Sequence, residues 1–153
     1  MKKQHKTYTR PKNLFDTNRI QSDKELLKKY GLRSKSEIWK AESRIKRIRT
    51  QAKSLIIHPE KQKIFFEKLE KMGLIKASES SIDTVLSLTK ENLLNRRLQT
   101  IVLKLGLAKT MNESRQLITH RKIKLGETLI TIPSYTVDID EEGNISKIDA
   151  VSQ

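Results

Sequence analysis

The sequence contains no cysteine. This absence excludes a disulfide framework, a thiolate zinc site and a cysteine nucleophile. Long apolar runs are also missing, since none approaches the roughly 18 residues that a membrane-spanning helix needs. The basic opening, MKKQHKTYTRPKN, lacks the apolar stretch of a secretory signal. We therefore expect a soluble, cytoplasmic protein that does not insert into a membrane.

Recognised catalytic motifs are absent as well. The histidines, His5, His58 and His120, are scattered, and none has a metal-binding spacing such as H-E-x-x-H. The chain has no phosphate-binding loop, dinucleotide fingerprint or G-x-S-x-G motif. The acidic residues at 138–142 lack the spacing of an EF-hand and are interpreted as a solvated strand end and turn. We predict no enzymatic activity, metal, cofactor or small-molecule substrate.

Aromatic residues make up only 5% of the chain, whereas positive charge is abundant. Lysine and arginine total 32 against 18 acidic residues, which gives a formal net charge of +14. A polyanion, either nucleic acid or an acidic membrane surface, is the natural partner of such a chain. Because few aromatic rings are present to stack bases, the composition favours folded RNA recognised through its shape, phosphates and 2′-hydroxyls.

The positive charge is concentrated near the N-terminus. Residues 1–50 hold 16 basic and 5 acidic residues, whereas residues 101–153 hold 7 of each. Such asymmetry suits a protein that contacts a polyanion with one end. We predict that residues 1–50 run along nucleic acid and that residues 138–153 face protein or solvent. A disordered basic tail without a specific role is the alternative.

The first half of the chain is predicted to be helical after an extended arm at residues 1–20. A short helix starts at Ser22 or Asp23 and ends at Gly31, a left-handed C-cap. Ser34 and Glu37 then have the spacing of a capping box. Apolar residues recur after this cap at three- and four-residue steps, which predicts one buried stripe on a long helix. The stripe consists of Ile38, Ala41, Ile45, Ile48, Ala52 and Leu55.

A basic stripe lies on another face of the same predicted helix. Lys40, Arg44 and Arg47 form it, with Arg49 nearby and few acids between them. Like charges at helical spacing repel one another, so a chain that keeps them usually has a counter-anion. We interpret this stripe as a phosphate-contacting face, the alternative being an ordinary solvated face. Trp39 is assigned to packing rather than to base stacking.

The middle of the chain is predicted to contain further helices. Pro59 begins one that Gly73 ends, with Leu74 folding back on the last turn. Residues 76–81 are interpreted as a linker and as the best candidate boundary. A short helical turn follows, and Thr89 then caps a helix that continues to Leu105.

The last third is predicted to combine one more helix with hairpins. Thr110 and Glu113 repeat the capping-box spacing before a helix over residues 111–120. The next segment alternates polar and apolar residues across Gly126-Glu127, which fits a type II′ turn with glycine first. Residues 138–153 are expected to form a second, acidic hairpin and a tail.

These elements suggest a nucleic-acid interface built from the starts of two helices and from the basic segments before them. Free backbone amides at a helix start bind phosphate well. The candidate RNA-contacting residues are Arg96, Arg97, Lys109, Thr110, Asn112, Arg115, Gln116, His120, Arg121, Lys122 and Lys124, together with Lys2, Lys3, Lys6, Arg10, Arg33, Lys40, Arg44, Arg47 and Arg49.

Two stretches resemble a known family. RRLQTIVLKLGLAKTMNESRQLITHRKI, followed by IPSYTV, is similar to the RNA-binding module of the small-subunit ribosomal protein S-four family. Upstream, YGLRSKSEIWKAESRIKRIRTQAKSLI resembles the archaeal and eukaryotic branch of that family, and the short chain favours an archaeal source. The resemblance covers roughly residues 8 to 148. Two positions depart from the family pattern: the turn at Gly126-Glu127, where Asn-Gly or Asp-Gly is usual, and Arg121, where glycine is common.

The resemblance implies an α+β fold, with a helical N-terminal region and a small module of two helices packed on a short antiparallel sheet (αL-type). It implies a non-catalytic, primary rRNA-binding protein that helps nucleate assembly of the small-subunit body. Its expected neighbours are small-subunit rRNA, ribosomal protein S-five, through which it affects decoding accuracy, and the mRNA entrance region. The implied division is an arm (1–20), a helical rRNA-binding region (21–80), a connecting helix start (81–95), the module (96–137) and the acidic hairpin and tail (138–153).

Two other functions remain open at the level of sequence. The module could be the accessory domain of an RNA-modifying or tRNA-charging enzyme, although the remaining residues offer no catalytic domain. It could also belong to a free-standing RNA-binding stress factor that rescues stalled ribosomal subunits. The upstream segment argues against the second alternative.

Overall fold

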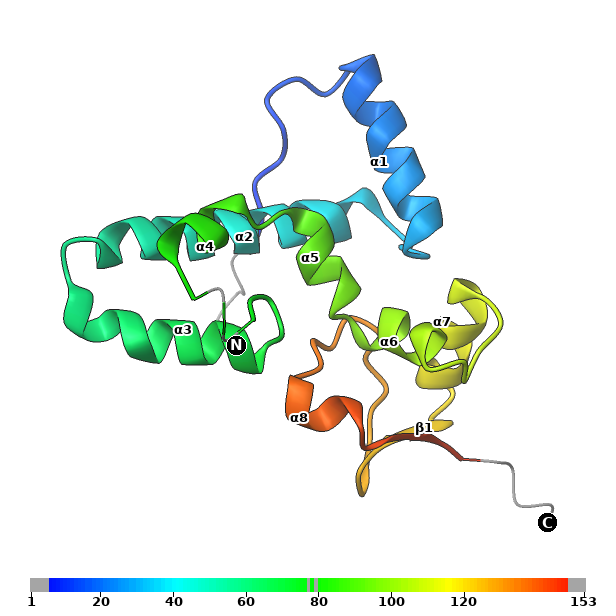
Figure 1. Ribbon diagram of the computed structural model, residues 1–153. Helices are drawn as coiled ribbons and strands as arrows, with labels where there is room; N and C mark the ends of the chain where they lie inside the picture. Colours follow the sequence, from blue (N-terminus) through cyan, green and yellow to red (C-terminus); the bar gives the residue numbers. More distant parts are fainter. Residues whose placement is uncertain (1–5, 77, 79, 149–153) are drawn as a thin grey trace, which may run out of the picture.

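The computed structural model describes residues 6–76, 78 and 80–148 and confirms the predicted α+β class (Figure 1). A helical region forms the first part, and a module of helices and short strands forms the second. The helices are α1 (Thr17–Lys29), α2 (Lys35–Leu55), the 3-10 turn η1 (Pro59–Lys61), α3 (Gln62–Lys71), α4 (Ile82–Ser87), α5 (Lys90–Asn95), α6 (Leu98–Lys104), α7 (Met111–Thr119) and α8 (Ile139–Glu142). The strands are β1 (Ile123–Leu125), β2 (Thr128–Leu129) and β3 (Ile145–Lys147).

Helix α2 organises the helical region. Its predicted apolar stripe, from Ile38 to Ala52, is buried, and it packs against α1, α4 and α5. Burying such a stripe removes apolar surface from water, which is the main stabilising contribution to a helix of this length. Trp39 lies against the ring of Tyr8, with ring centroids 5.9 Å apart, so the predicted packing role of Trp39 is confirmed.

Helix α1 begins earlier than predicted. The carboxylate of Asp16 accepts hydrogen bonds from the amides of Asn18, at 3.1 Å, and Arg19, at 3.4 Å. This N-cap satisfies two amides that have no partner inside the helix. Residues 17–20, predicted as part of an extended arm, are therefore helical. The predicted end at Gly31 is confirmed by its positive φ of 54°.

The hydrophobic core of the helical region continues across the predicted linker. Helix α3 ends as expected, because Gly73 has a φ of +66° and the Leu74 amide donates to the Leu69 carbonyl at 3.0 Å. Ile75, just before the linker, and Val85, just after it, belong to the same buried cluster. Residues 76–81, of which 77 and 79 lie outside the described part, thus join two segments of one core.

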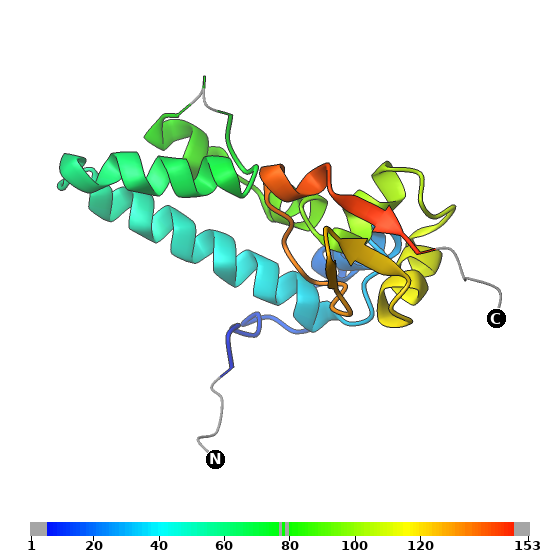
Figure 2. The same cartoon turned by 90° about the horizontal axis from the view of Figure 1, so that it is seen from below.

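The module has its own hydrophobic core beneath a three-stranded antiparallel sheet of order β2-β1-β3 (Figure 2). Leu125 pairs with Thr128, so Gly126 and Glu127 form a two-residue turn. Gly126 has a φ of +58°, whereas Glu127 has no positive φ. This confirms the predicted hairpin and its glycine-first turn.

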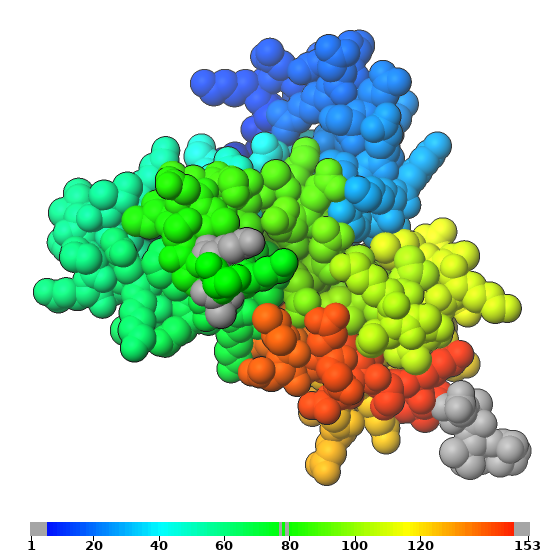
Figure 3. All heavy atoms as spheres, viewed as in Figure 1, coloured from blue at the N-terminus to red at the C-terminus, as the bar shows by residue number. Residues whose placement is uncertain are grey.

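The predicted second hairpin at the C-terminal end is wrong. Residues 139–142 form helix α8, whose start is tied by a 3.2 Å hydrogen bond from the Asp138 amide to the Glu141 carboxylate. Strand β3 then pairs with β1 through Ile145 and Leu125. The segment around α8 lies against the end of α3 (orange and green in Figure 3), so it connects the module to the helical region.

Candidate nucleic-acid interface

The predicted continuous helix from Thr89 to Leu105 is broken at Arg96 and Arg97. Helix α5 ends at Asn95, and Arg97 has extended backbone angles, with φ −72° and ψ 141°, before α6 starts. The Leu98 amide donates to the Tyr135 carbonyl at 2.8 Å, and the Val137 amide donates to the Arg96 carbonyl at 2.9 Å. Local periodicity could not predict this break, because its hydrogen-bond partners come from a distant segment.

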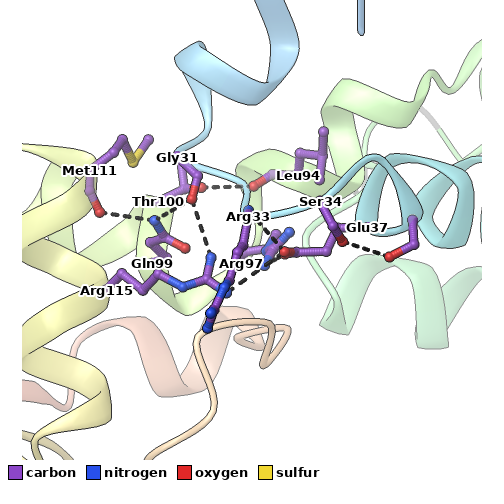
Figure 4. Close-up of polar contacts among 11 residues, drawn as sticks. Gly31, Arg33, Ser34, Glu37, Leu94, Arg97, Gln99, Thr100, Met111 and Arg115 are labelled. Carbon is purple, nitrogen blue, oxygen red and sulfur yellow. Dashed lines mark hydrogen bonds and ion pairs between the residues drawn. The ribbon is translucent and has the colours of Figure 1, made fainter. Parts of the chain in front are cut away.

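The break directs Arg97 into the interior (Figure 4). Only 6% of Arg97 is exposed, and its guanidinium donates to the Glu37 carboxylate over 2.6 Å. Arg115 of α7 approaches the same carboxylate at 3.7 Å and donates to the Gly31 carbonyl at 3.2 Å. Glu37 therefore joins α2 to the start of α6 and to α7.

The charge state of Glu37 is fixed by these contacts. Burial on its own would raise the pKa of this carboxyl group, but the hydrogen bond and charge of Arg97 oppose burial and prevail. The Arg33 amide, which donates to Glu37 at 3.1 Å, and the charge of Arg115 act in the same direction. The pKa of Glu37 is thus held below its ordinary value, and the side chain is ionised at neutral pH.

Arg96 is also bound within the protein. Its guanidinium donates to the Glu142 carboxylate at 2.7 Å and to the Val137 carbonyl at 2.9 Å, and it lies against Gly73. Arg49, half-buried on α2, donates to the Leu88 carbonyl at 2.6 Å. We therefore do not include Arg96, Arg97 or Arg49 in the proposed RNA face, although all three were sequence candidates.

In both predicted capping boxes, the glutamate carboxylate accepts a hydrogen bond from the amide one residue before the N-cap instead of from the N-cap amide. Ser34 makes no capping hydrogen bond, and Glu37 accepts from the Arg33 amide instead. At the start of α7 the Thr110 hydroxyl does accept the Glu113 amide at 3.2 Å, while the Glu113 carboxylate accepts the Lys109 amide at 2.7 Å. The start of α7 thus carries a carboxylate and uses these amides internally. It is less suited to binding phosphate than its sequence suggested.

Exposed polar and basic side chains gather around α7 and its C-terminal corner. Arg121 has a φ of +58°, the left-handed region in which side chains other than glycine are strained. Its amide donates to the Ile118 carbonyl at 3.1 Å, which closes the end of α7. Arg115 and Lys124 are half-buried. The exposed members of this group are Lys109, Thr110, Asn112, Gln116, His120, Arg121 and Lys122.

The basic stripe of α2 reaches the module across a groove. Lys40 and Arg44 line one side, and Arg115 and Ser134 line the other. The Arg44 guanidinium donates to the Thr136 hydroxyl at 3.1 Å, which links the two sides. Glu37 is the one acidic residue among the described residues of this groove, and Arg97 neutralises it. The groove is therefore cationic along its length.

The N-terminal segment lies along α2. The Thr9 amide donates to the Ser43 hydroxyl at 3.4 Å, and Lys6 and Arg10 are exposed beside it. Exposed Arg33 lies before the start of α2, and exposed Arg47 lies further along that helix. Lys2 and Lys3 lie outside the described residues.

Glu37 and Thr136 position the interface, although neither was predicted from the sequence to do so. Glu37 was assigned only to capping, and Thr136 received no role. The predicted PSY motif, Pro133 to Tyr135, did mark the correct segment, because Tyr135 binds the α6 amide and donates its hydroxyl to Glu141 at 3.0 Å. Burial and the Glu141 charge raise the pKa of Tyr135, so the phenol remains protonated.

The part of the chain that the structure describes contains neither a cluster of candidate metal ligands nor a candidate membrane-spanning helix. There, no three histidine or acidic side chains gather closely enough to hold a metal ion. None of the helices described combines the length and apolar character needed to span a bilayer.

Comparisons with known proteins match the module by itself and the chain nearly as a whole. Residues 96–142 match the S4 domain. The whole chain is similar to small ribosomal subunit protein uS4 of Saccharolobus solfataricus, with 46% identity across 94% of this chain and 82% of the relative. The same protein of Saccharolobus islandicus is also 46% identical, and that of Sulfolobus acidocaldarius is 41% identical over 92% of this chain and 83% of the relative. Because this similarity extends over nearly the whole chain, the protein belongs to the uS4 family of small ribosomal subunit proteins.

Proposed function

We propose that this protein is a non-catalytic rRNA-binding constituent of the small ribosomal subunit. Membership of the uS4 family over 94% of the chain is the observation that carries the proposal. The net charge of +14 and the cationic groove between α2 and the module support it. RNA phosphates would lie along this groove and continue onto the corner after α7.

The side chains proposed to contact rRNA are exposed ones. Arg33 and Lys40 stand on the α2 side, and Lys109, Arg121 and Lys122 stand on the module side. Asn112, Gln116 and His120 supply further donors beside them. Since these groups come from two cores held together by Glu37, the relative placement of the cores sets the spacing of phosphate contacts. Recognition by phosphate spacing is a shape-based mode that suits folded RNA.

An early role in assembly of the small subunit follows from the same proposal. An early, primary binder of this kind would organise the body of the subunit before other proteins join. The family resemblance supports a contact with ribosomal protein S-five near the mRNA entrance. Through this contact the protein would influence decoding accuracy. Omitting the protein from a reconstitution of archaeal small subunits should stall particles at an early sedimentation value, and adding it first should restore them.

Binding to small-subunit rRNA across a series of salt concentrations tests the proposal. Each lost phosphate contact should reduce the salt slope of the binding constant by about one. The double variant Arg33→Ala and Lys40→Ala should therefore lower the slope by about two and weaken binding at low salt. Lys63→Ala with Lys71→Ala removes the same charge from exposed positions of α3 and serves as the control. Equal losses in both double variants would contradict the proposed face.

A further inference from the structure

A second groove lies between α2 and α3. Figure 2 shows these two helices at the end of the molecule away from the module. It encloses about 710 Å³. Its floor is apolar, with Ile48 and Leu69 buried and Leu55, Phe65 and Met72 half-buried. Ile64 is 70% exposed on the wall. Isolated exposed apolar residues need no explanation, but a continuous apolar floor under an exposed isoleucine marks an interaction surface.

The rim of this groove is positively charged on both sides. Arg44 and Arg47 stand on the α2 wall, and Lys61, the last residue of η1, and Lys68 of α3 stand on the opposite wall. No acidic residue is among the described residues that line it. An occupant that matches this surface must be apolar along its centre and acidic along both edges.

The walls also define the shape of the occupant. The α2 wall runs from Arg44 to Ser54, and the α3 wall from Lys61 to Met72, each with residues at three- and four-residue steps. Ten residues of helix rise about 15 Å, so the groove accommodates about three helical turns. Two helical ridges with an apolar floor between them form a surface on which an amphipathic helix can dock.

We propose that this groove binds an acidic amphipathic helix of another protein. Aliphatic side chains at positions i, i+3, i+4 and i+7 of that helix would contact the floor and Ile64. Its flanking carboxylates would pair with Arg47 on one wall and with Lys61 and Lys68 on the other. RNA matches the rim but not the floor, because nucleic acid presents no aliphatic surface to Ile48, Leu55 and Leu69.

A synthetic peptide tests the proposal with the full chain. The probe is a fluorescent helix of about 14 residues, with leucines at the spacing above and glutamates on both flanks, and a scrambled peptide of the same composition accompanies it. The amphipathic peptide should bind and the scrambled one should bind at least about tenfold more weakly. Ile64→Ser should weaken the amphipathic peptide by about tenfold, the loss expected when one aliphatic anchor is removed. Ile132→Ser, an exposed isoleucine of the module, should have no effect.

The charges of the rim provide a second, independent measurement. Lys61→Glu with Lys68→Glu should weaken the acidic peptide and strengthen a peptide whose flanks are lysine. Equal binding of the scrambled peptide, or an unchanged affinity in Ile64→Ser, would overturn the proposal.

Two further outcomes would assign the groove to another occupant. If Ile64→Ser weakened binding to small-subunit rRNA and not to the peptide, the occupant would be RNA. If the chain dimerised in sedimentation and Ile64→Ser abolished the dimer, the occupant would be a second copy. Either result would overturn the proposal and leave the rRNA-binding function itself intact, because that function is read from the salt slope.

Discussion

At the scale of single residues, the arginines of this protein divide into two groups with opposite roles. Arg96 and Arg97 are bound by carboxylates inside the fold, whereas Arg33 and Arg121 are exposed. A buried guanidinium needs a partner because its desolvation is costly, and an exposed one does not. The internal arginines therefore organise the interface, and the exposed ones are available to a ligand.

Glu37 is the residue on which this organisation depends. Glu37→Gln removes the charge that Arg97 and Arg115 contact and should lower the free energy of unfolding by about 2–3 kcal/mol. Urea unfolding measures this, with Glu25→Gln on the exposed face of α1 as a matched control. Because the folded-state pKa of Glu37 is lowered, its stabilising contribution is complete at neutral pH and is lost as the pH falls through that value. The difference between wild type and Glu37→Gln should accordingly shrink in acid. A cost equal to that of Glu25→Gln would refute this role.

Arg121 combines backbone strain with an exposed charge. Replacing it with glycine relieves the left-handed conformation and should stabilise the fold by about 1 kcal/mol. The same change removes a proposed phosphate contact and should flatten the salt slope of rRNA binding by about one. Arg121→Ala separates the two effects, since it loses the charge and keeps the strain. Thermal unfolding of both variants measures the relief of strain, and rRNA binding measures the lost contact. Undiminished binding in either variant would exclude Arg121 from the RNA face.

At the scale of elements, the ends of helices decide how the two cores meet. Helix α3 ends at Gly73, and the Arg96 guanidinium lies so close that a Cβ at Gly73 would be 2.8 Å from it. Helix α5 ends where Arg96 turns toward Glu142 of α8. The end of α3, the break after α5 and the start of the C-terminal segment thus converge on one guanidinium.

Gly73→Ala tests this convergence, with Gly106→Ala as its control. Both glycines have positive φ, at +66° and +73°, so both alanines incur a backbone cost of about 1 kcal/mol. Gly106 has open space around it, whereas Gly73 faces Arg96. Gly73→Ala should therefore cost about 1–2 kcal/mol more in denaturant unfolding, because the Arg96 ion pair is displaced. Similar costs for the two variants would show that Arg96 adapts freely.

At the scale of the whole molecule, positive charge is concentrated in the N-terminal third, the part proposed to contact RNA. The arm, α1 and α2 carry the excess, and the C-terminal third is neutral overall. The long-range field of such a molecule orients it on a polyanion before specific contacts form. The acidic α8 segment also serves the fold directly, since Glu142 binds Arg96.

Removing residues 1–10 tests the role of the arm. This deletion eliminates Lys2, Lys3, Lys6 and Arg10, and it also removes the Thr9–Ser43 hydrogen bond and the Tyr8–Trp39 ring contact. The salt slope of rRNA binding should fall by as much as about four, with a modest fall in the thermal midpoint. Circular dichroism and the binding assay together measure both. An unchanged slope would mean that the arm does not contact RNA.

The sequence by itself determined most of the helices, the buried stripe of α2, the first hairpin and the excess of positive charge. Each of these depends on local spacing or composition, which a single chain segment contains in full. The predicted cap residues Thr110 and Gly73 were correct for the same reason.

The tertiary structure decided which polar residues belong to the interior. In the sequence, Arg97 looks like one more basic residue on a periodic helix. Its partner, Glu37, lies 60 residues away, and the helix break that turns Arg97 inward depends on a hydrogen bond to the Tyr135 carbonyl. Asp138 and Glu141 likewise close a helical turn where acidic composition suggested a strand end. Pairing of charges across distant segments is set by the packing of the two cores, and no local pattern encodes it.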